Sequence, residues 1–350
     1  MRYLIFLAMA LLGCTDDSPP AAVDSMYFPP TDSDQWETVS PSSLQWDATA
    51  QEDLITYLEQ KNTKAFLVLV DGRIAMEVYL NGHNANSPWY WASAGKTLTA
   101  TVTGIAEQEG LLSLNAPVSQ YLGNGWTSAP AAKENLITVR HLLTMTSGLN
   151  DALGDAVHPA NLQYVADAGT RWAYHNVYVK LQDVVAQSSG TSWNTYFASR
   201  LRDRIGMNGQ WLSSGEDLSV YWSTARSMAR FGLLALNRGR WENEIIINES
   251  FFADATTTSQ NLNQAYGYLW WLNGKESYRL PQLQFSFQGT LIPAAPADMV
   301  MALGKNDQKI YVVPSKKMVI VRMGNAADDV NMALSDFDNV LWQKIQAMLP

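Results

Sequence analysis

The chain has 350 residues, of which 47% are hydrophobic and 16% are charged, so it can bury a sizeable core without disulfides or a structural metal. The formal net charge is −9 and the lysines and arginines form no run, so we expect no nucleic-acid partner. Cys14 is the only cysteine, which excludes an intrachain disulfide.

The N-terminus has the layout of a secretory signal peptide. Arg2 precedes an apolar run over residues 3–12, which is shorter than the roughly 20 residues that a membrane-spanning helix needs. The following LLGC resembles a bacterial lipobox, although Leu12 stands where a smaller residue is usual. We therefore expect a lipoprotein signal peptide over residues 1–13 and lipidation of Cys14. An uncleaved anchor and a plain signal peptide are the alternatives.

A lipidated Cys14 would tie the protein to the bacterial cell envelope, with the lipid as its only contact with the membrane. Thr15 after the cysteine, in place of aspartate, is typical of lipoproteins sorted to the periplasmic side of an outer membrane. Residues 14–45 are rich in Asp, Ser and Pro and have little periodicity, which predicts a flexible tether. The folded domain is expected over residues 46–350.

Helix and strand patterns at both ends of this domain predict one sheet. Two β-rich runs flank the dipeptide Asp71-Gly72, which is a strong hairpin signal. Apolar residues at helical spacing predict a first helix and a closing helix, and further strands precede the latter. The expected ranges are 47–62 (helix), 65–70 and 73–80 (hairpin), 310–313 and 318–322 (strands), and 335–348 (helix).

The middle of the chain, about 111–260, reads as helices and loops, for example over 178–188 and 223–237. An antiparallel sheet built from both ends, flanked by helices and joined to a mostly helical lobe, is an α+β architecture. A cleft between sheet and lobe is the default place for an active site.

The first motif with chemical content lies in residues 89–100, WYWASAGKTLTA, which contain Ser93-x-x-Lys96. A helix that begins at Ser93 would put both side chains on one face and offer a backbone N–H to an oxyanion. Lys96 can act as the base for a serine nucleophile only if burial or a nearby cation lowers its pKa. The pattern occurs by chance about once in a chain of this length, so a helix-starting serine with a surface lysine is the alternative.

A second motif is Tyr174-His175-Asn176. A tyrosine beside a lysine ammonium can have a lowered pKa and serve as a base. The alternative is a loop tyrosine that packs against Trp172.

Five further stretches accompany these motifs in a family-typical order: residues 137–149 (ITVRHLLTMTSGL), 169–176 (GTRWAYHN), 205–207 (IGM), 225–232 (ARSMARFG) and 266–271 (YGYLWW). Together they resemble the serine β-lactamase-related hydrolases on their class C-like, penicillin-binding side, nearest the 6-aminohexanoate-oligomer hydrolases and their esterase relatives. The resemblance covers about residues 50–345. It implies Ser93 as the acylated nucleophile, Lys96 as its proton partner and Tyr174 as the general acid and base. Asn176 would orient Lys96 and the substrate amide.

The family's third motif corresponds to residues 301–308, MALGKNDQ, expected on an edge strand opposite the helix. The resemblance implies that Gly304 belongs to the site and that the Lys305 N–H is the second oxyanion donor beside that of Ser93. Asn306 and Asp307 replace the usual glycines, and both tolerate left-handed turns.

The Lys-Thr-Gly form of this motif is absent, which favours an esterase or amidase over a β-lactamase. The resemblance implies no metal or organic cofactor, and a small-molecule or peptide-like ester or amide as substrate. A D-alanyl-D-alanine carboxypeptidase, a weak β-lactamase and an inactive peptidoglycan-binding module are the alternatives. The presence of all of Ser93, Lys96, Tyr174 and Asn176 argues against the last. Asp151 and Asp155 are interpreted as loop residues.

Overall fold

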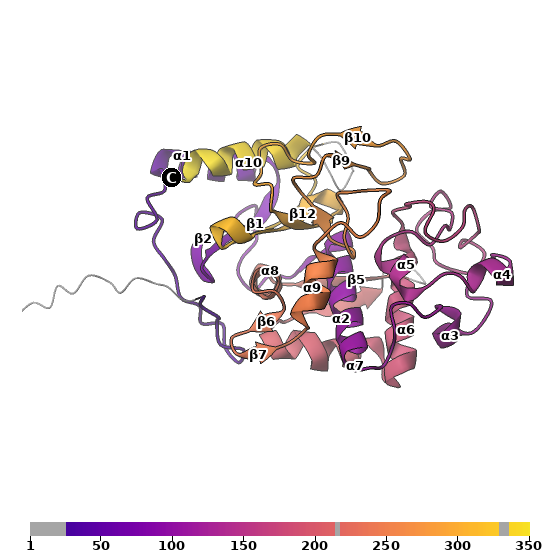
Figure 1. Ribbon diagram of the computed structural model, residues 1–350. Helices are drawn as coiled ribbons and strands as arrows, with labels where there is room; N and C mark the ends of the chain where they lie inside the picture. The colour runs from indigo at the N-terminus through magenta and orange to yellow at the C-terminus, as the bar shows by residue number, and fades with distance from the viewer. Residues whose placement is uncertain (1–25, 214–217, 329–335) are drawn as a thin grey trace, which may run out of the picture.

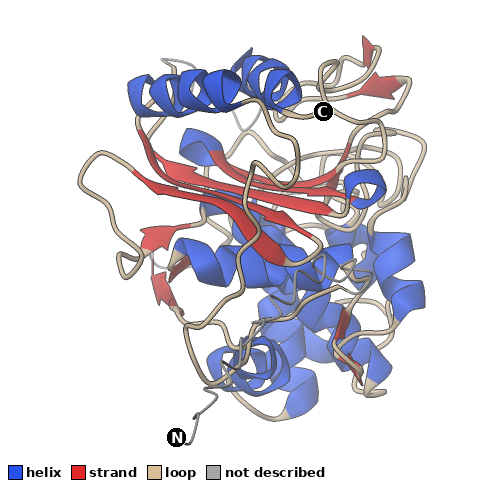
Figure 2. Cartoon of the chain, turned by 90° about the vertical axis from the view of Figure 1, so that its left-hand side faces the viewer, coloured by secondary structure: helices blue, strands red, loops and turns tan. Residues whose placement is uncertain are grey.

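The computed structural model describes residues 26–213, 218–328 and 336–350. Strands from both ends of the chain form a six-stranded antiparallel sheet at its centre (Figure 2). The strand order is β2-β1-β13-β12-β11-β8. The strands are β1 (Thr63–Val70), β2 (Arg73–Tyr79), β8 (Trp271–Leu272), β11 (Val300–Gly304), β12 (Gln308–Val313) and β13 (Met318–Gly324).

The predicted hairpin opens the sheet. Asp71 and Gly72 join β1 to β2, and their φ angles of 48° and 80° both lie in the left-handed region. Two such residues in succession form a turn whose twist matches that of the strands, which explains why Asp-Gly is favoured there. The two predicted strands at 310–313 and 318–322 are also confirmed as the β12–β13 pair, and η6 (Pro314–Lys316) joins them.

Helices cover both faces of the sheet, as Figures 1 and 2 show. The predicted first and last helices, α1 (Ala48–Gln60) and α10 (Asp336–Met348), pack together on one face. On the other face, α8 (Ala225–Leu236) packs against β1, β12 and β13. The predicted α+β architecture, an antiparallel sheet flanked by helices, is therefore confirmed.

The helical lobe contains the remaining long helices, α2 (Lys96–Gln108) and α6 (Val179–Ser189) (Figure 1). Its centre is α2, in which nearly every residue is buried, including four threonines. Three of them donate their hydroxyls to carbonyls three or four residues earlier in the chain, so these buried hydroxyls have local hydrogen-bond partners. Gly110, just after the end of α2, has a left-handed φ of 73°, as is common where a helix ends in glycine.

Shorter elements connect these layers. The helices and helical turns are η1 (Ala92–Gly95), α3 (Ser119–Leu122), α4 (Ala131–Glu134), α5 (Val139–Leu143), η2 (Asn176–Tyr178), α7 (Trp193–Phe197), the π-helical turn η3 (Ala198–Arg202), η4 (Asp203–Ile205), α9 (Glu249–Ala255) and η5 (Lys305–Asp307). The short strands are β3 (Trp89–Tyr90), β4 (Gln210–Ser213) and β5 (Ser219–Ser223) in one small sheet, β6 (Arg240–Trp241) with β7 (Glu244–Ile245), and β9 (Ser277–Tyr278) with β10 (Phe287–Gln288).

The expectation of a flexible tether as far as residue 45 is wrong for residues 26–45. This segment lies against the domain through hydrogen bonds that its polar composition does not reveal. The Tyr27 amide donates to the Asp71 carbonyl at 2.9 Å, and the Trp36 indole donates to the Gly72 carbonyl at 2.8 Å. The buried Arg230 guanidinium donates to carbonyls of Pro29, Pro30 and Ser33.

The predicted signal peptide, Cys14 and the first part of the predicted tether lie outside the described residues. Within the described ranges, none of the helices combines the length and the apolar character that crossing a membrane requires.

Candidate active site

Ser93 lies in η1, the turn that leads directly into α2. Lys96 is the first residue of α2, and its Nζ donates to the Ser93 Oγ at 2.7 Å. The helix therefore begins one turn later than the sequence predicts, but the two side chains meet as predicted. Ala92, just before the serine, has a left-handed φ of 47°, a strained conformation of the kind that often occurs at functional sites.

Lys96 is buried, with only 2% of its surface exposed. Its Nζ lies 4.7 Å from the ring centre of Tyr174 and 4.5 Å from that of Tyr178. Burial lowers the pKa of Lys96 to about 7, while the Asp155 carboxylate acts in the opposite direction. A substantial fraction of Lys96 is thus a neutral amine at neutral pH, which can accept a proton from Ser93.

We predict that kcat/KM for ester hydrolysis rises as the pH increases through about 7, because protonated Lys96 cannot act as a base. The measurement is the pH profile of kcat/KM with a p-nitrophenyl ester. A profile that stays flat across pH 7 would contradict a role for Lys96 as the base.

Tyr174 is enclosed by aromatic side chains. Its ring centre lies 6.1 Å from that of Trp172, 6.1 Å from that of Tyr266 and 5.6 Å from that of Trp271. Burial raises the pKa of Tyr174 to about 12, against the opposing effect of hydrogen bonding with Ser93 and Trp271. The expected lowering of this pKa is wrong, because desolvation outweighs the hydrogen bonds with Ser93 and Trp271. At neutral pH Tyr174 is a phenol, which can donate a proton.

Asn176 reaches the same cleft but makes a different contact from the one expected. Its Nδ2 donates to the backbone carbonyl of Asp155 at 3.3 Å and to the Asp155 carboxylate at 3.0 Å. Among the described residues no hydrogen bond joins it to Lys96, so the predicted orientation of Lys96 by Asn176 is not observed. Asn176 instead holds the loop that brings Asp155 to the cleft wall.

His175 also lines the cleft, and burial lowers its pKa to about 4, so it is neutral at pH 7. Asp151, another cleft residue, forms an ion pair of 2.6 Å with Arg171.

Strand β11 forms the opposite wall, and Gly304 is where it meets the serine. A Cβ on Gly304 would lie 2.4 Å from the Trp91 carbonyl oxygen and 3.0 Å from the Ala94 nitrogen, on either side of Ser93. The φ of Gly304, −132°, is ordinary extended backbone, so the glycine is needed for space and not for conformation. The sequence alone gives the motif but not this close approach.

The predicted edge position of this strand needs a small correction. The two-residue β8 pairs with Val300 and Met301, so β11 is not the outermost strand. Among the described residues, β8 pairs with no residue of β11 beyond Met301. The end of β11 at Gly304 can therefore lie directly against η1. Lys305 follows and lines the cleft.

The cleft has a volume of about 380 Å³. Its walls are Ser93, Lys96, Asp151, Gly154, Asp155, Tyr174, His175, Asn176, Pro281, Gln282 and Lys305. Asp151 and Asp155 are loop residues, as expected, yet both reach it. Sequence reasoning missed Tyr178, Pro281 and Gln282. The only sequence signal for Tyr178 is its position four residues after Tyr174. The loop around Pro281 has no sequence feature that would indicate a place in the cleft.

The antiparallel sheet with its helical lobe, and the serine–lysine pair where the two meet, define the class of the serine β-lactamases and transpeptidases. Residues 55–341 match the Beta-lactamase family, and the chain belongs to that family. Among known proteins it is similar to an uncharacterised protein of Alkalihalophilus pseudofirmus, with 24% identity over 74% of this chain and 82% of the relative.

Solved structures share the fold. A protein of Bacillus anthracis described as a 6-aminohexanoate-dimer hydrolase superposes with a TM-score of 0.68 at 19% identity, over 92% of this chain and 89% of its own. A β-lactamase from Mycobacterium bovis superposes with a TM-score of 0.62 at 20% identity, over 86% of this chain and 100% of its own. A penicillin-binding protein from Bacillus halodurans superposes with a TM-score of 0.60 at 18% identity, over 85% of this chain and 100% of its own. The family indicates a hydrolase of the β-lactamase and penicillin-binding type.

Proposed function

We propose that the protein is a serine hydrolase that cleaves an ester or amide bond through an acyl-enzyme on Ser93. One observation carries the proposal: the Lys96 Nζ lies 2.7 Å from the Ser93 Oγ in a buried position that lowers the pKa of Lys96 to about 7. A surface lysine in a helix's first turn would be solvated and charged, so this geometry supports catalysis over the structural alternative. It also supports an active site over an inactive binding module.

In the proposed mechanism, Lys96 takes the Ser93 proton as Oγ attacks the substrate carbonyl carbon. The backbone N–H groups of Ser93 and Lys305 stabilise the developing oxyanion. Tyr174, a phenol at neutral pH, donates a proton to the departing oxygen or nitrogen and recovers one from Lys96. A water molecule then attacks the acyl carbon by the same proton route in reverse, which releases the acid and restores Ser93.

A small cleft of about 380 Å³ supports a small-molecule or short peptide-like substrate. The chain has no Lys-Thr-Gly motif, which favours an ester or amide over a β-lactam. One observation supports a second candidate: Lys305 on the cleft wall is a cation that could pair with a substrate carboxylate. A D-alanyl-D-alanine carboxypeptidase or weak β-lactamase activity would use such a contact.

A substrate panel tests this proposal. We expect hydrolysis of short p-nitrophenyl esters and of linear aminohexanoate dimer to exceed that of a cephalosporin and of a D-Ala-D-Ala peptide, and to vanish in Ser93→Ala. A preference for the D-Ala-D-Ala peptide would refute the esterase and amidase assignment and favour the second candidate.

Tyr174→Phe should slow amide hydrolysis by about a hundredfold and activated-ester hydrolysis by less than about tenfold, because only the amine needs a proton to leave. The measurement is kcat/KM, which reports acylation and so the departure of the leaving group, on a matched anilide and p-nitrophenyl ester pair. Tyr178→Phe is the control, since it also keeps a ring beside Lys96 and should show no such difference. Equal losses on both substrates in Tyr174→Phe would refute its role as the acid.

We also propose that the mature protein is held at the outer membrane, on the periplasmic side, by lipid on Cys14. The LLGC stretch after an apolar run supports this. Detergent partitioning of the full chain tests it: we expect the wild type in the membrane fraction and Cys14→Ser outside it. Equal partitioning of the two would refute lipidation.

A further inference from the structure

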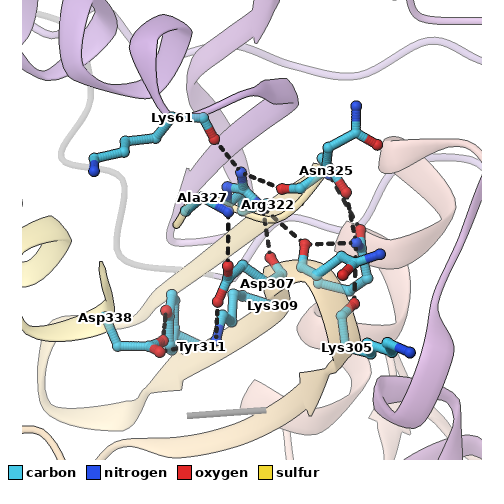
Figure 3. Close-up of polar contacts among 12 residues, drawn as sticks. Lys61, Lys305, Asp307, Lys309, Tyr311, Arg322, Asn325, Ala327 and Asp338 are labelled. Atoms are coloured by element: carbon cyan, nitrogen blue, oxygen red, sulfur yellow. Dashed lines mark hydrogen bonds and ion pairs between the residues drawn. The ribbon is translucent and has the colours of Figure 1, made fainter. Parts of the chain in front are cut away.

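Four buried charged side chains lie in and beside the turn that carries Lys305 (Figure 3). They are Asp307 in η5, Lys309 in β12, Arg322 in β13 and Asp338 in α10. Each has at most 1% of its surface exposed. Their charges balance, but removing four charges from water is costly even when they are paired. Apolar side chains could fill this space, so the fold alone gives little reason for charges here.

Arg322 fastens the turn to the sheet. Its Nη1 donates to the carbonyls of Asp307 at 2.8 Å and Asn306 at 3.3 Å. Its Nη2 and Nε reach the Lys61 carbonyl at the end of α1 and the Thr63 hydroxyl in β1. One planar guanidinium therefore fixes the turn relative to two other elements.

The turn itself has an unusual backbone that needs such support. Asn306 and Asp307 both have a φ of 60°, so two successive non-glycine residues are left-handed, as their chemistry allows. The Gln308 Nε2 donates to the carbonyls of Lys305 at 3.3 Å and Asn306 at 2.8 Å. Together, Gln308 and Arg322 donate hydrogen bonds to all three backbone carbonyls of η5. These bonds fix the orientation of the peptide planes in the turn.

A chain of contacts then leads from the turn to the C-terminal helix. The Asp307 carboxylate lies 3.2 Å from the Lys309 Nζ and accepts from the Ala327 amide at 2.9 Å. Lys309 in turn contacts Asp338 of α10 at 2.8 Å, and Asp338 accepts from the Tyr311 hydroxyl. In Figure 3 the Lys305 side chain extends away from this network.

We propose that this network of Asp307, Lys309, Arg322 and Asp338 is a positioning device that sets the Lys305 N–H where the oxyanion forms. Through Asp338, the C-terminal helix α10 thereby helps to hold this oxyanion donor in place. The inference rests on the proposed function, in which that N–H is an oxyanion donor. Oxyanion stabilisation depends on donors fixed before the reaction, so a shift of about 1 Å in this turn costs about a hundredfold in rate.

The main test compares two buried arginines. Arg322→Lys keeps the charge but loses the planar fork that holds the turn. Arg230→Lys is the matched control, because Arg230 in α8 is also buried and also donates to backbone carbonyls, those of Ile205, Pro30 and Ser33, but does not contact the turn. The readouts are Tm and the kcat and KM for a p-nitrophenyl ester, measured on the full chain below both Tm values.

We expect Arg322→Lys to lower kcat about tenfold to a hundredfold with KM changed less than about twofold. The acid limb of its pH profile should stay near 7, since Lys96 is untouched. Arg230→Lys should lower Tm about as much as Arg322→Lys does, with kcat unchanged. A folded Arg322→Lys with wild-type kcat, or equal kcat losses in the two variants, would overturn the proposal.

A second variant covers the case in which Arg322→Lys does not fold. Lys309→Met with Asp338→Asn removes one charge of each sign and breaks the contacts of Lys309 with both Asp307 and Asp338. The new amide can still accept from Tyr311. We expect the same loss of kcat, and a folded double variant with wild-type kcat would overturn the proposal. Labelling of Ser93 in the wild type by a fluorophosphonate distinguishes a failure of the proposed function from a failure of the network's proposed role. Without that label the proposed function fails, whereas a labelled wild type with unaffected variants refutes only the network's role.

Discussion

Replacing Lys96 with methionine is expected to lower kcat/KM for ester hydrolysis by about a thousandfold or more. Methionine fills the space between Tyr174 and Tyr178 but cannot take the Ser93 proton. The measurement is steady-state hydrolysis of a p-nitrophenyl ester by wild type and variant. A loss of less than about tenfold would mean that another group activates Ser93.

The same variant should become more stable, which separates this loss from misfolding. Burial lowers the pKa of Lys96 from 10.5 to about 7, so between these pH values the unfolded chain holds a proton that the folded chain lacks. The resulting cost in folding free energy is complete below about pH 7 and disappears above about 10.5. Lys96→Met removes that cost, so we expect a gain on the order of a few kcal/mol at neutral pH. Lower stability of the variant would contradict this account of the buried lysine.

Gly304→Ala is expected to lower kcat by about a hundredfold with a smaller effect on KM. The added Cβ would lie 2.4 Å from the Trp91 carbonyl oxygen, so β11 and η1 must move apart. That movement separates the Ser93 and Lys305 N–H groups, which the mechanism needs at a fixed spacing. The measurement is kcat and KM for a p-nitrophenyl ester.

Gly232→Ala is the matched control for that substitution. Its Cβ would meet the Val319 Cγ1, also at 2.4 Å, but between α8 and the sheet and away from the cleft. Both variants should lose stability, and only Gly304→Ala should lose kcat. A wild-type kcat for folded Gly304→Ala would show that the strand and the serine need not be so close.

The elements predicted most accurately are those fixed by local chemistry. The Asp71-Gly72 hairpin, α1 and α10 follow from turn residues and helical spacing, which depend only on neighbours in the chain. The family resemblance places Asn306 and Asp307 where glycines are usual, their side chains tolerate left-handed turns, and both are left-handed in the structure.

What the sequence did not reveal depends on contacts between distant segments. The pKa of Tyr174 rises because the residue is buried, and rings from far along the chain, those of Tyr266 and Trp271, pack against it. The partner of Asn176 is Asp155, in a loop without periodicity. Residues 26–45 have the composition of a tether, yet their backbone finds partners at the β1–β2 turn and on α8. Composition and spacing cannot report such tertiary partners.

Mass spectrometry of the protein after treatment with a fluorophosphonate shows directly whether Ser93 is an activated nucleophile. We expect a single adduct on the peptide that contains Ser93, none in Ser93→Ala, and much slower labelling in Lys96→Met. No adduct on Ser93 in the folded wild type, or equal labelling of Ser93→Ala at another residue, would contradict this expectation.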